Sequence, residues 1–149
     1  MISFNKSNKV YGALSNFWDC PAGVRYQGIL YDNAEAAFQA QKTTDMAERL
    51  TFRYQSANQA KKHGRRVCLR DDWDSIKYDI MRDILYCKFS QDVTLRELLL
   101  STGNEKIEEN TTNWHDNEWG HCYCSRCANK EHKNILGKTL MEVRELLRQ

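Results

Sequence analysis

Three polar residues are spaced so that they fall on one face of a predicted helix. Glu35, Gln39 and Lys42 stand at positions i, i+4 and i+7, and residues at this spacing lie on one stripe of an α-helix. A carboxylate can position water or stabilise a developing cation, and an amine of lowered pKa can attack a carbonyl. An exposed charged stripe with weak pairing has the same spacing. The stripe alone therefore fits either acid–base chemistry or a solvated surface.

A second set of candidates lies in the polar segment after Gly103. Asp116, Trp119 and Gly120 form a D-x-x-W-G step, and Trp114 precedes it without any apolar periodicity. A loop tryptophan beside carboxylates can stack on a planar ligand such as a nucleobase, because its ring buries a large area at low entropic cost. The alternative is a lid in which the tryptophan packs on the core.

A third set is a cluster of cysteines. Cys122, Cys124 and Cys127 form C-x-C-x-x-C, which provides three thiolates, one ligand short of a tetrahedral structural zinc site. The histidines that could complete it are His115, His121 and His132. A metal-free loop with reduced thiols and a redox role are the alternatives.

The composition favours a single globular domain over residues 1–149. Of the 149 residues 41% are hydrophobic and 28% charged, and the formal net charge is only +2, which argues against a strongly basic nucleic-acid-binding surface. A basic run at residues 61–66 is either a local patch or a solvated helix end. No stretch approaches the roughly 18 apolar residues that span a bilayer, and no apolar signal segment stands at the start. We therefore expect a cytoplasmic protein with no membrane partner.

A short hairpin and a helix are predicted to position the first set. Residues 23–33 alternate in hydropathy and are rich in β-formers, which indicates two short strands. Residues 32–45 are strong helix formers, with Asp32 or Asn33 as the N-cap.

The rest of the chain is predicted to be mainly helical. Residues 56–64 begin with a capping box of Ser56 and Gln59 and end at Gly64 as the C′ residue. Further helices are predicted at residues 71–89, 92–103 and 133–149. The last of these is amphipathic, with apolar residues at Leu136, Leu140, Val143 and Leu147. The fold class expected is α+β, a single compact helix-rich domain with a small amount of β-strand.

Six separated stretches, in this order, resemble one known family. They are GALSNFW (12–18), EAAFQAQK (35–42), DWDSIKYDIMRDILYCKF (72–89), STGNEKIEE (101–109), DNEWG (116–120) and NILGKTLMEVR (134–144). Together they resemble the NADAR, or YbiA-like, N-glycosidase family over nearly the whole chain. The resemblance implies a helix-rich α+β domain that hydrolyses an N-glycosidic bond and requires no cofactor.

The resemblance also implies two substrate classes. Some members remove ADP-ribose from guanine bases in nucleotides or DNA, and others cleave ribosylated pyrimidine intermediates of riboflavin synthesis. We expect the first activity, with the second as an alternative. A non-catalytic module that binds ADP-ribose is a further alternative, disfavoured because Glu35, Lys42 and Asp116 are all present. A zinc-knuckle RNA binder is disfavoured by the near-neutral charge and the incomplete ligand set. The oligomeric state stays open.

Site residues follow from the resemblance and from the neighbours of the matched positions. The expected catalytic residues are Glu35, Lys42 and Asp116. The expected substrate-binding residues are Asn16, Phe17, Gln39, Trp114, Trp119, Gly120, Asn134 and Arg144. Any zinc at the cysteines is expected to be structural, because glycosidic cleavage needs no thiol-rich site. The chain departs from the family pattern at Ala36–Ala37, in a longer segment before Asp116, and in the cysteine loop.

Several roles remain alternatives. Asp116 or Glu35 would stabilise the positive charge that develops on the sugar, while the other orients water or moves protons. Trp119 or Trp114 would stack on the base. Lys42 would act as a fixed cation, or as a desolvated amine that forms a Schiff base with the opened sugar. A phosphate clamp and an internal pair with a carboxylate are the two interpretations of Arg144.

Overall fold

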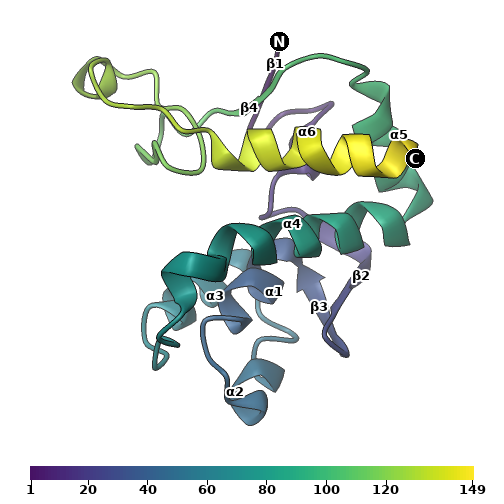
Figure 1. The fold of residues 1–149 in the computed structure, drawn as a ribbon, viewed down its shortest axis with the longest axis vertical. Coiled ribbons are helices and arrows are strands. Elements are labelled where there is room, and N and C mark those ends of the chain that lie inside the picture. The colour runs from purple at the N-terminus through teal and green to yellow at the C-terminus, as the bar shows by residue number, and fades with distance from the viewer.

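A long helix, α4 (Trp73–Gln91), runs through the middle of the computed structural model, which describes residues 1–149. Helix α6 (Ile135–Arg148) lies alongside it on one face, and α5 (Val93–Ser101) packs against both. Helices α1–α3 and a hairpin lie on the other side of α4 (Figure 1). The helix-rich α+β fold class is confirmed.

The later helices follow their predicted sequence signals. The buried residues of α6 include the four apolar positions expected of its amphipathic face, Leu136, Leu140, Val143 and Leu147. Asp92 caps α5, where its side chain accepts hydrogen bonds from the backbone N–H groups of Thr94 and Leu95. Both helices are therefore specified by local pattern and capping.

Two small sheets complete the fold. Strand β2 (Asp19–Tyr26) pairs antiparallel with β3 (Ile29–Asn33), which confirms the hairpin. Strand β1 (Ile2–Phe4) pairs in parallel with β4 (Ile107–Glu109), and Phe4 stands opposite Glu109. The second pairing was not predicted, because its strands are three residues long and about a hundred residues apart in the chain.

Helix α1 (Ala34–Ala40) begins at Asn33, whose side chain accepts a hydrogen bond from the N–H of Ala36 at 2.8 Å. The N-cap is thus Asn33 and not Asp32. The helix ends earlier than predicted, so Lys42 lies beyond its last turn. A short helix that was not predicted, α2 (Met46–Leu50), follows.

Helix α3 (Ala57–Gly64) confirms the capping box, because the Ser56 and Gln59 side chains each bond the other's backbone N–H. The prediction that Gly64 is a C′ residue is wrong: Gly64 belongs to the helix, and Arg65 is the C-cap. The reason for a glycine here is packing, since a Cβ at Gly64 would lie 1.9 Å from Gln39 Oε1.

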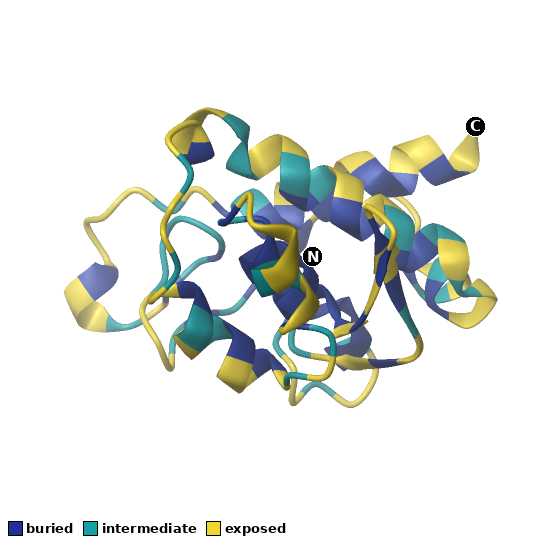
Figure 2. Cartoon of the chain, turned by 90° about the horizontal axis from the view of Figure 1, so that it is seen from below, coloured by how far each residue is buried: buried dark blue, intermediate teal, exposed yellow.

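One connected core lies between these layers. It includes Phe4, Tyr31, Phe52 and Phe89, all almost completely buried. Figure 2 shows buried positions on the inner faces of the helices and strands and exposed positions around the outside. Two one-turn 3-10 helices, η1 (Gly12–Leu14) and η2 (Ser125–Cys127), connect the larger elements. None of the helices combines the length and apolar character needed to cross a bilayer.

Candidate active site

A cavity of about 460 Å³ opens where the N-terminal segment, α1, α3 and the segment after β4 meet. Its charged lining residues are Lys6, Glu35, Lys61, Glu109 and Asp116. Its aromatic lining residues are Phe17, Phe38, Trp114 and Trp119. Pockets of this size, mostly apolar with a few polar groups, are typical of small-molecule sites.

Glu35 stands in the first turn of α1 and faces the cavity with only 8% of its surface exposed. Its backbone N–H donates to the carbonyl of Asn16 at 3.0 Å, and its Oε1 accepts from Gln39 Nε2 at 2.8 Å. Burial raises the pKa of Glu35, although the Gln39 bond and the charge of Lys61 oppose that rise. Glu35 and Gln39, which their i, i+4 spacing placed on one face of the helix, are therefore hydrogen-bonded to each other and buried.

Glu109, the last residue of β4, provides a second buried carboxyl group at the cavity. Burial above all, together with the charges of Asp116 and Glu35, raises the pKa of Glu109 from 4.5 to about 8. A carboxyl group with this pKa holds its proton at neutral pH and can act as a general acid. Glu109 was not among the predicted site residues. The only sequence signal was its place at the end of the matched stretch at 101–109.

Asp116 is the third carboxylate that lines the cavity. Its Oδ1 accepts hydrogen bonds from the N–H groups of Glu118 and Trp119, both at 2.9 Å. The D-x-x-W-G step is thus a turn held by its own aspartate. The same turn brings Trp119 to the cavity.

The lysines that line the cavity are Lys6 and, in α3, Lys61, and Lys42 is not among the lining residues. The Lys42 ammonium lies 5.9 Å from the Trp73 ring centroid. Burial lowers the pKa of Lys42, and the charge of Glu35 opposes this shift. The structure therefore corrects the expectation that Lys42 lies on the same stripe as Glu35 and Gln39, because α1 ends before it.

Asn16, Phe17 and Gln39, three of the predicted substrate-binding residues, line the cavity. Two of them carry buried acceptors, Asn16 Oδ1 and Gln39 Oε1, which have no hydrogen-bond partner. Buried polar atoms are rarely left unpaired. Gln39 Oε1 is directed at Gly64 of α3, where an added Cβ would lie 1.9 Å from it. Lys88 of α4 fixes the loop that carries Asn16, because its ammonium group donates to the carbonyl of Ser15 at 2.9 Å.

The two predicted stacking residues lie in different environments. Trp119 packs edge-on against Phe38 and Tyr78, with ring centroids 5.4 Å apart in each pair. Trp114 also lines the cavity and remains 42% exposed. Trp119 therefore forms part of the wall, and Trp114 is the ring available to a ligand.

Three predicted substrate-binding residues lie outside the cavity lining. Asn134 bonds β4 through its side chain, accepting from the N–H of Glu109 and donating to the carbonyl of Ile107. Arg144 donates to the Thr102 hydroxyl at 2.9 Å and to a backbone carbonyl. A Cβ at Gly120 would lie 2.6 Å from the carbonyl oxygen of Glu109. Asn134 and Gly120 thus position the strand that carries Glu109, and Arg144 makes internal bonds, with a hydroxyl and a carbonyl instead of the predicted carboxylate.

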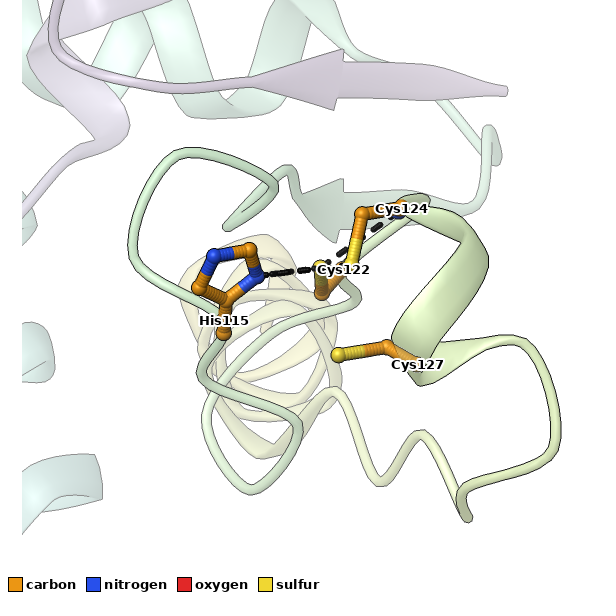
Figure 3. Close-up of side chains that lie close together, drawn as sticks. All are labelled: His115, Cys122, Cys124 and Cys127. Atoms are coloured by element: carbon orange, nitrogen blue, oxygen red, sulfur yellow. Dashed lines mark hydrogen bonds between the residues drawn. The ribbon is translucent and has the colours of Figure 1, made fainter.

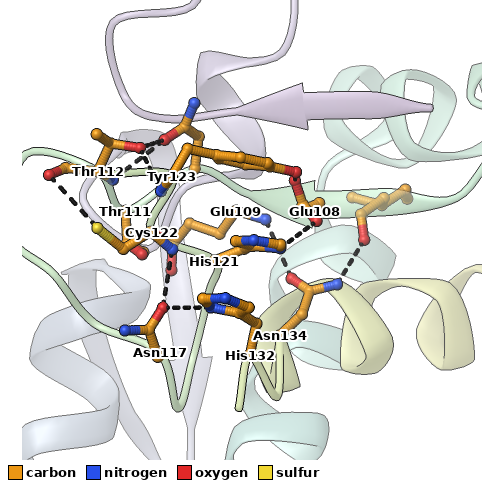
Figure 4. A network of polar contacts seen from close by, with 12 residues as sticks. Glu108, Glu109, Thr111, Thr112, Asn117, His121, Cys122, Tyr123, His132 and Asn134 are labelled. Carbon is orange, nitrogen blue, oxygen red and sulfur yellow. Dashed lines mark hydrogen bonds and ion pairs between the residues drawn. The ribbon is translucent and has the colours of Figure 1, made fainter. Parts of the chain in front are cut away.

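The cysteines also lie outside the cavity lining. Cys122, Cys124 and Cys127 gather around His115 (Figure 3). The other two candidate histidines have different partners: His121 bonds Glu108 and His132 bonds Asn117, and their rings stack on each other (Figure 4).

Comparison with known proteins places this geometry in context. A family model described as the NADAR domain matches residues 3–148. An N-glycosidase of Nostoc punctiforme is 38% identical over 153 residues, which cover 99% of this chain and 92% of that protein. The NMR structure of the Escherichia coli protein YbiA has a TM-score of 0.80 and 37% identity, and the match covers 99% of this chain and 84% of that one. A riboflavin biosynthesis protein of Vibrio vulnificus is 31% identical, over 99% of this chain but only 39% of that protein.

Proposed function

The chain belongs to the NADAR domain family, and on that premise we propose that its cavity hydrolyses the C–N glycosidic bond of a ribosylated base. The substrate we propose is ADP-ribosylated guanine in nucleotides or DNA. One observation carries the proposal: Glu35, Glu109 and Asp116 meet in one cavity, and the pKa of Glu109 lies near 8. Glycosidic cleavage usually uses a pair of carboxyl groups, one protonated and one ionised.

Cleavage of the bond leaves positive charge on the anomeric carbon and negative charge on the departing base. In our proposal Glu109, which carries a proton at neutral pH, donates it to the base as the C–N bond breaks. The carboxylate of Asp116 stabilises the oxocarbenium-like sugar. Glu35, held by Gln39, orients the water that forms the new C–O bond. The proton released by the water returns to the carboxylate of Glu109.

The remaining groups are assigned to binding. Trp114 is exposed at the cavity and stacks on the base. Asn16 and Gln39, whose side chains line the cavity, are assigned to contact the sugar. Lys61 and Lys6 supply positive charge for the phosphates of ADP-ribose. We assign Lys42 the role of a fixed positive charge near Glu35, because its amine lies outside the cavity lining.

A ribosylated pyrimidine is the second candidate substrate. One relative, a protein of Vibrio vulnificus, is named for riboflavin biosynthesis. Two lysines at the cavity favour the diphosphate of ADP-ribose over a single phosphate.

The test is to incubate purified protein with guanine-ADP-ribosylated DNA and, separately, with the ribosylated pyrimidine, and to measure released sugar by mass spectrometry. Suitable variants are Glu35→Gln and Asp116→Asn, in which the oxygen that accepts the local hydrogen bonds is retained. Glu131→Gln, at an exposed position, is the control. Release from the DNA, lost in both site variants, supports the proposal. Release of sugar only from the ribosylated pyrimidine would make this pyrimidine the substrate in place of ADP-ribosylated guanine. Release from neither compound would favour a module that binds its ligand without cleaving it.

A further inference from the structure

Four side chains that could hold a metal ion lie together outside the cavity: His115, Cys122, Cys124 and Cys127. One ligand atom from each lies within 4.8 Å of those of the other three. His115 Nδ1 is 3.2 Å from Cys122 Sγ and 3.4 Å from Cys124 Sγ. Figure 3 shows the ring and the sulfur atoms directed toward one another.

We propose that these four residues bind one Zn²⁺ ion as a structural Cys₃His site. A tetrahedral zinc with Zn–S bonds of about 2.3 Å and a Zn–N bond of about 2.0 Å sets a nitrogen and a sulfur ligand about 3.5 Å apart and two sulfur ligands about 3.8 Å apart. The separations of His115 Nδ1 from the sulfurs of Cys122 and Cys124, 3.2 and 3.4 Å, differ from this by only a few tenths of an ångström. The two outer cysteines of the set, Cys122 and Cys127, are buried, as structural zinc ligands usually are.

His115 is the fourth ligand for two reasons that do not depend on each other. His121 Nδ1 is hydrogen-bonded to Glu108, and His132 Nδ1 is hydrogen-bonded to Asn117. His115 Nδ1, in contrast, faces the sulfur atoms of Cys122 and Cys124. His115 also has a φ of 61°, which is uncommon for a residue other than glycine. Backbone strain of this kind persists where a functional contact holds it, and coordination of the ring supplies such a contact.

The surroundings suit a thiolate-bound metal. The N–H of Cys124 points at Cys122 Sγ at 3.5 Å, a contact that stabilises a negatively charged sulfur. Three thiolates and Zn²⁺ leave one net negative charge, and Arg126 stands beside the cluster, 3.2 Å from His115 Nε2. Metal on Nδ1 places the ring proton on Nε2. Nε2–H and the Arg126 guanidinium are then both donors, so this contact cannot persist as a hydrogen bond and the exposed Arg126 side chain is free to move.

The position of the cluster gives the ion a role. His115 lies between Trp114 and Asp116, which both line the cavity, and the cysteines lie beyond the D-x-x-W-G turn. An ion bound to His115 and to the three cysteines closes residues 115–127 into a ring and fixes the cavity wall that this segment forms. Four protein ligands leave no open coordination position, so the ion takes no part in the chemistry. The inference therefore goes beyond the proposed N-glycosidase activity and does not depend on it.

The test begins with the wild-type chain, made without a polyhistidine tag. Metal analysis is expected to find about one zinc per chain. Titration of the metal-free protein with Co²⁺ is expected to give the intense visible bands of tetrahedral cobalt bound to thiolates, which saturate at one equivalent. A metal content at background with a featureless cobalt spectrum overturns the proposal, as does a disulfide between any two of the three cysteines in freshly isolated protein.

Variants then identify the ligands. Cys124→Ser and His115→Gln are expected to weaken zinc binding more than a hundredfold. The matched controls, Cys68→Ser at an exposed free cysteine and His132→Gln at the neighbouring histidine, are expected to bind zinc as the wild type does. Loss of zinc in His132→Gln but not in His115→Gln contradicts the assignment of His115. Equal loss in Cys68→Ser contradicts a specific site.

Discussion

The raised pKa of Glu109 predicts how the stability of the fold changes with pH, which can be measured without a substrate. The pKa of Glu109 is about 8 in the folded protein against 4.5 for an ordinary glutamate. Between these values the folded chain holds a proton at Glu109 that the unfolded chain has released. The contribution of Glu109 to the free energy of unfolding is therefore fully present below pH 4.5 and is lost as the pH rises toward 8.

The size of the effect follows from linkage. One proton bound only by the folded state costs about 1.4 kcal/mol of the free energy of unfolding for each unit of pH. Glu109 is almost completely buried, so solvent screening does little to reduce this slope. Wild-type protein is expected to lose about 3 kcal/mol from this group between pH 5 and pH 7.

The assay is urea unfolding of wild type and Glu109→Gln at a series of pH values from 5 to 8. The amide introduced by this substitution does not titrate, so the stability of the variant relative to the wild type should rise by about 3 kcal/mol from pH 5 to pH 7. Glu97→Gln, at an exposed helical position, is the control and should follow the wild type at every pH. Wild-type and Glu109→Gln curves that run parallel would refute the buried, protonated Glu109.

Four further predictions test other parts of the protein. Gly64→Ala should destabilise the fold by about 1–3 kcal/mol in urea unfolding and lower turnover, because the added Cβ would lie 1.9 Å from Gln39 Oε1; unchanged stability and turnover would show that Gln39 can move freely. Lys61→Gln should raise KM about tenfold, because it removes a positive charge from the cavity; an unchanged KM would contradict a role for Lys61 in binding. Borohydride added during turnover should trap no covalent adduct, because the Lys42 amine lies outside the cavity lining. An adduct that is lost in Lys42→Ala would establish a covalent mechanism instead. Removal of zinc by a chelator should lower Tm by roughly 10 °C, as expected when a ligand present at about a thousand times its Kd is withdrawn, and the Tm of Cys124→Ser should not respond to the chelator.

Local sequence signals predicted the elements whose structure is decided locally. The amphipathic face of α6, the Ser56–Gln59 capping box and the Asp92 cap each depend on residues within a few positions of one another. The shared helix face of Glu35 and Gln39 belongs to the same class, and the structure adds a hydrogen bond between the two side chains.

Long-range contacts account for most of what was missed. Glu109 reaches the cavity because β4 pairs with β1, at the opposite end of the sequence, and no periodicity records that pairing. The position of Lys42 was misjudged because α1 ends at Ala40, shortly before Thr43, Thr44 and Asp45, which are weak helix formers. The cysteine spacing suggested a metal, but the choice of His115 over two closer histidines depends on how the loop folds back.

The most direct test of the central claim is the ratio of kcat/KM for wild type and Glu109→Gln on the base-modified substrate that the wild type cleaves. A general acid contributes about a hundredfold to ten-thousandfold, so the variant should fall by that factor, and wild-type activity should decline as the pH rises through about 8. A Glu109→Gln protein that stays folded and retains wild-type activity within a factor of two, with no such decline, would contradict the claim that this carboxyl group protonates the leaving base.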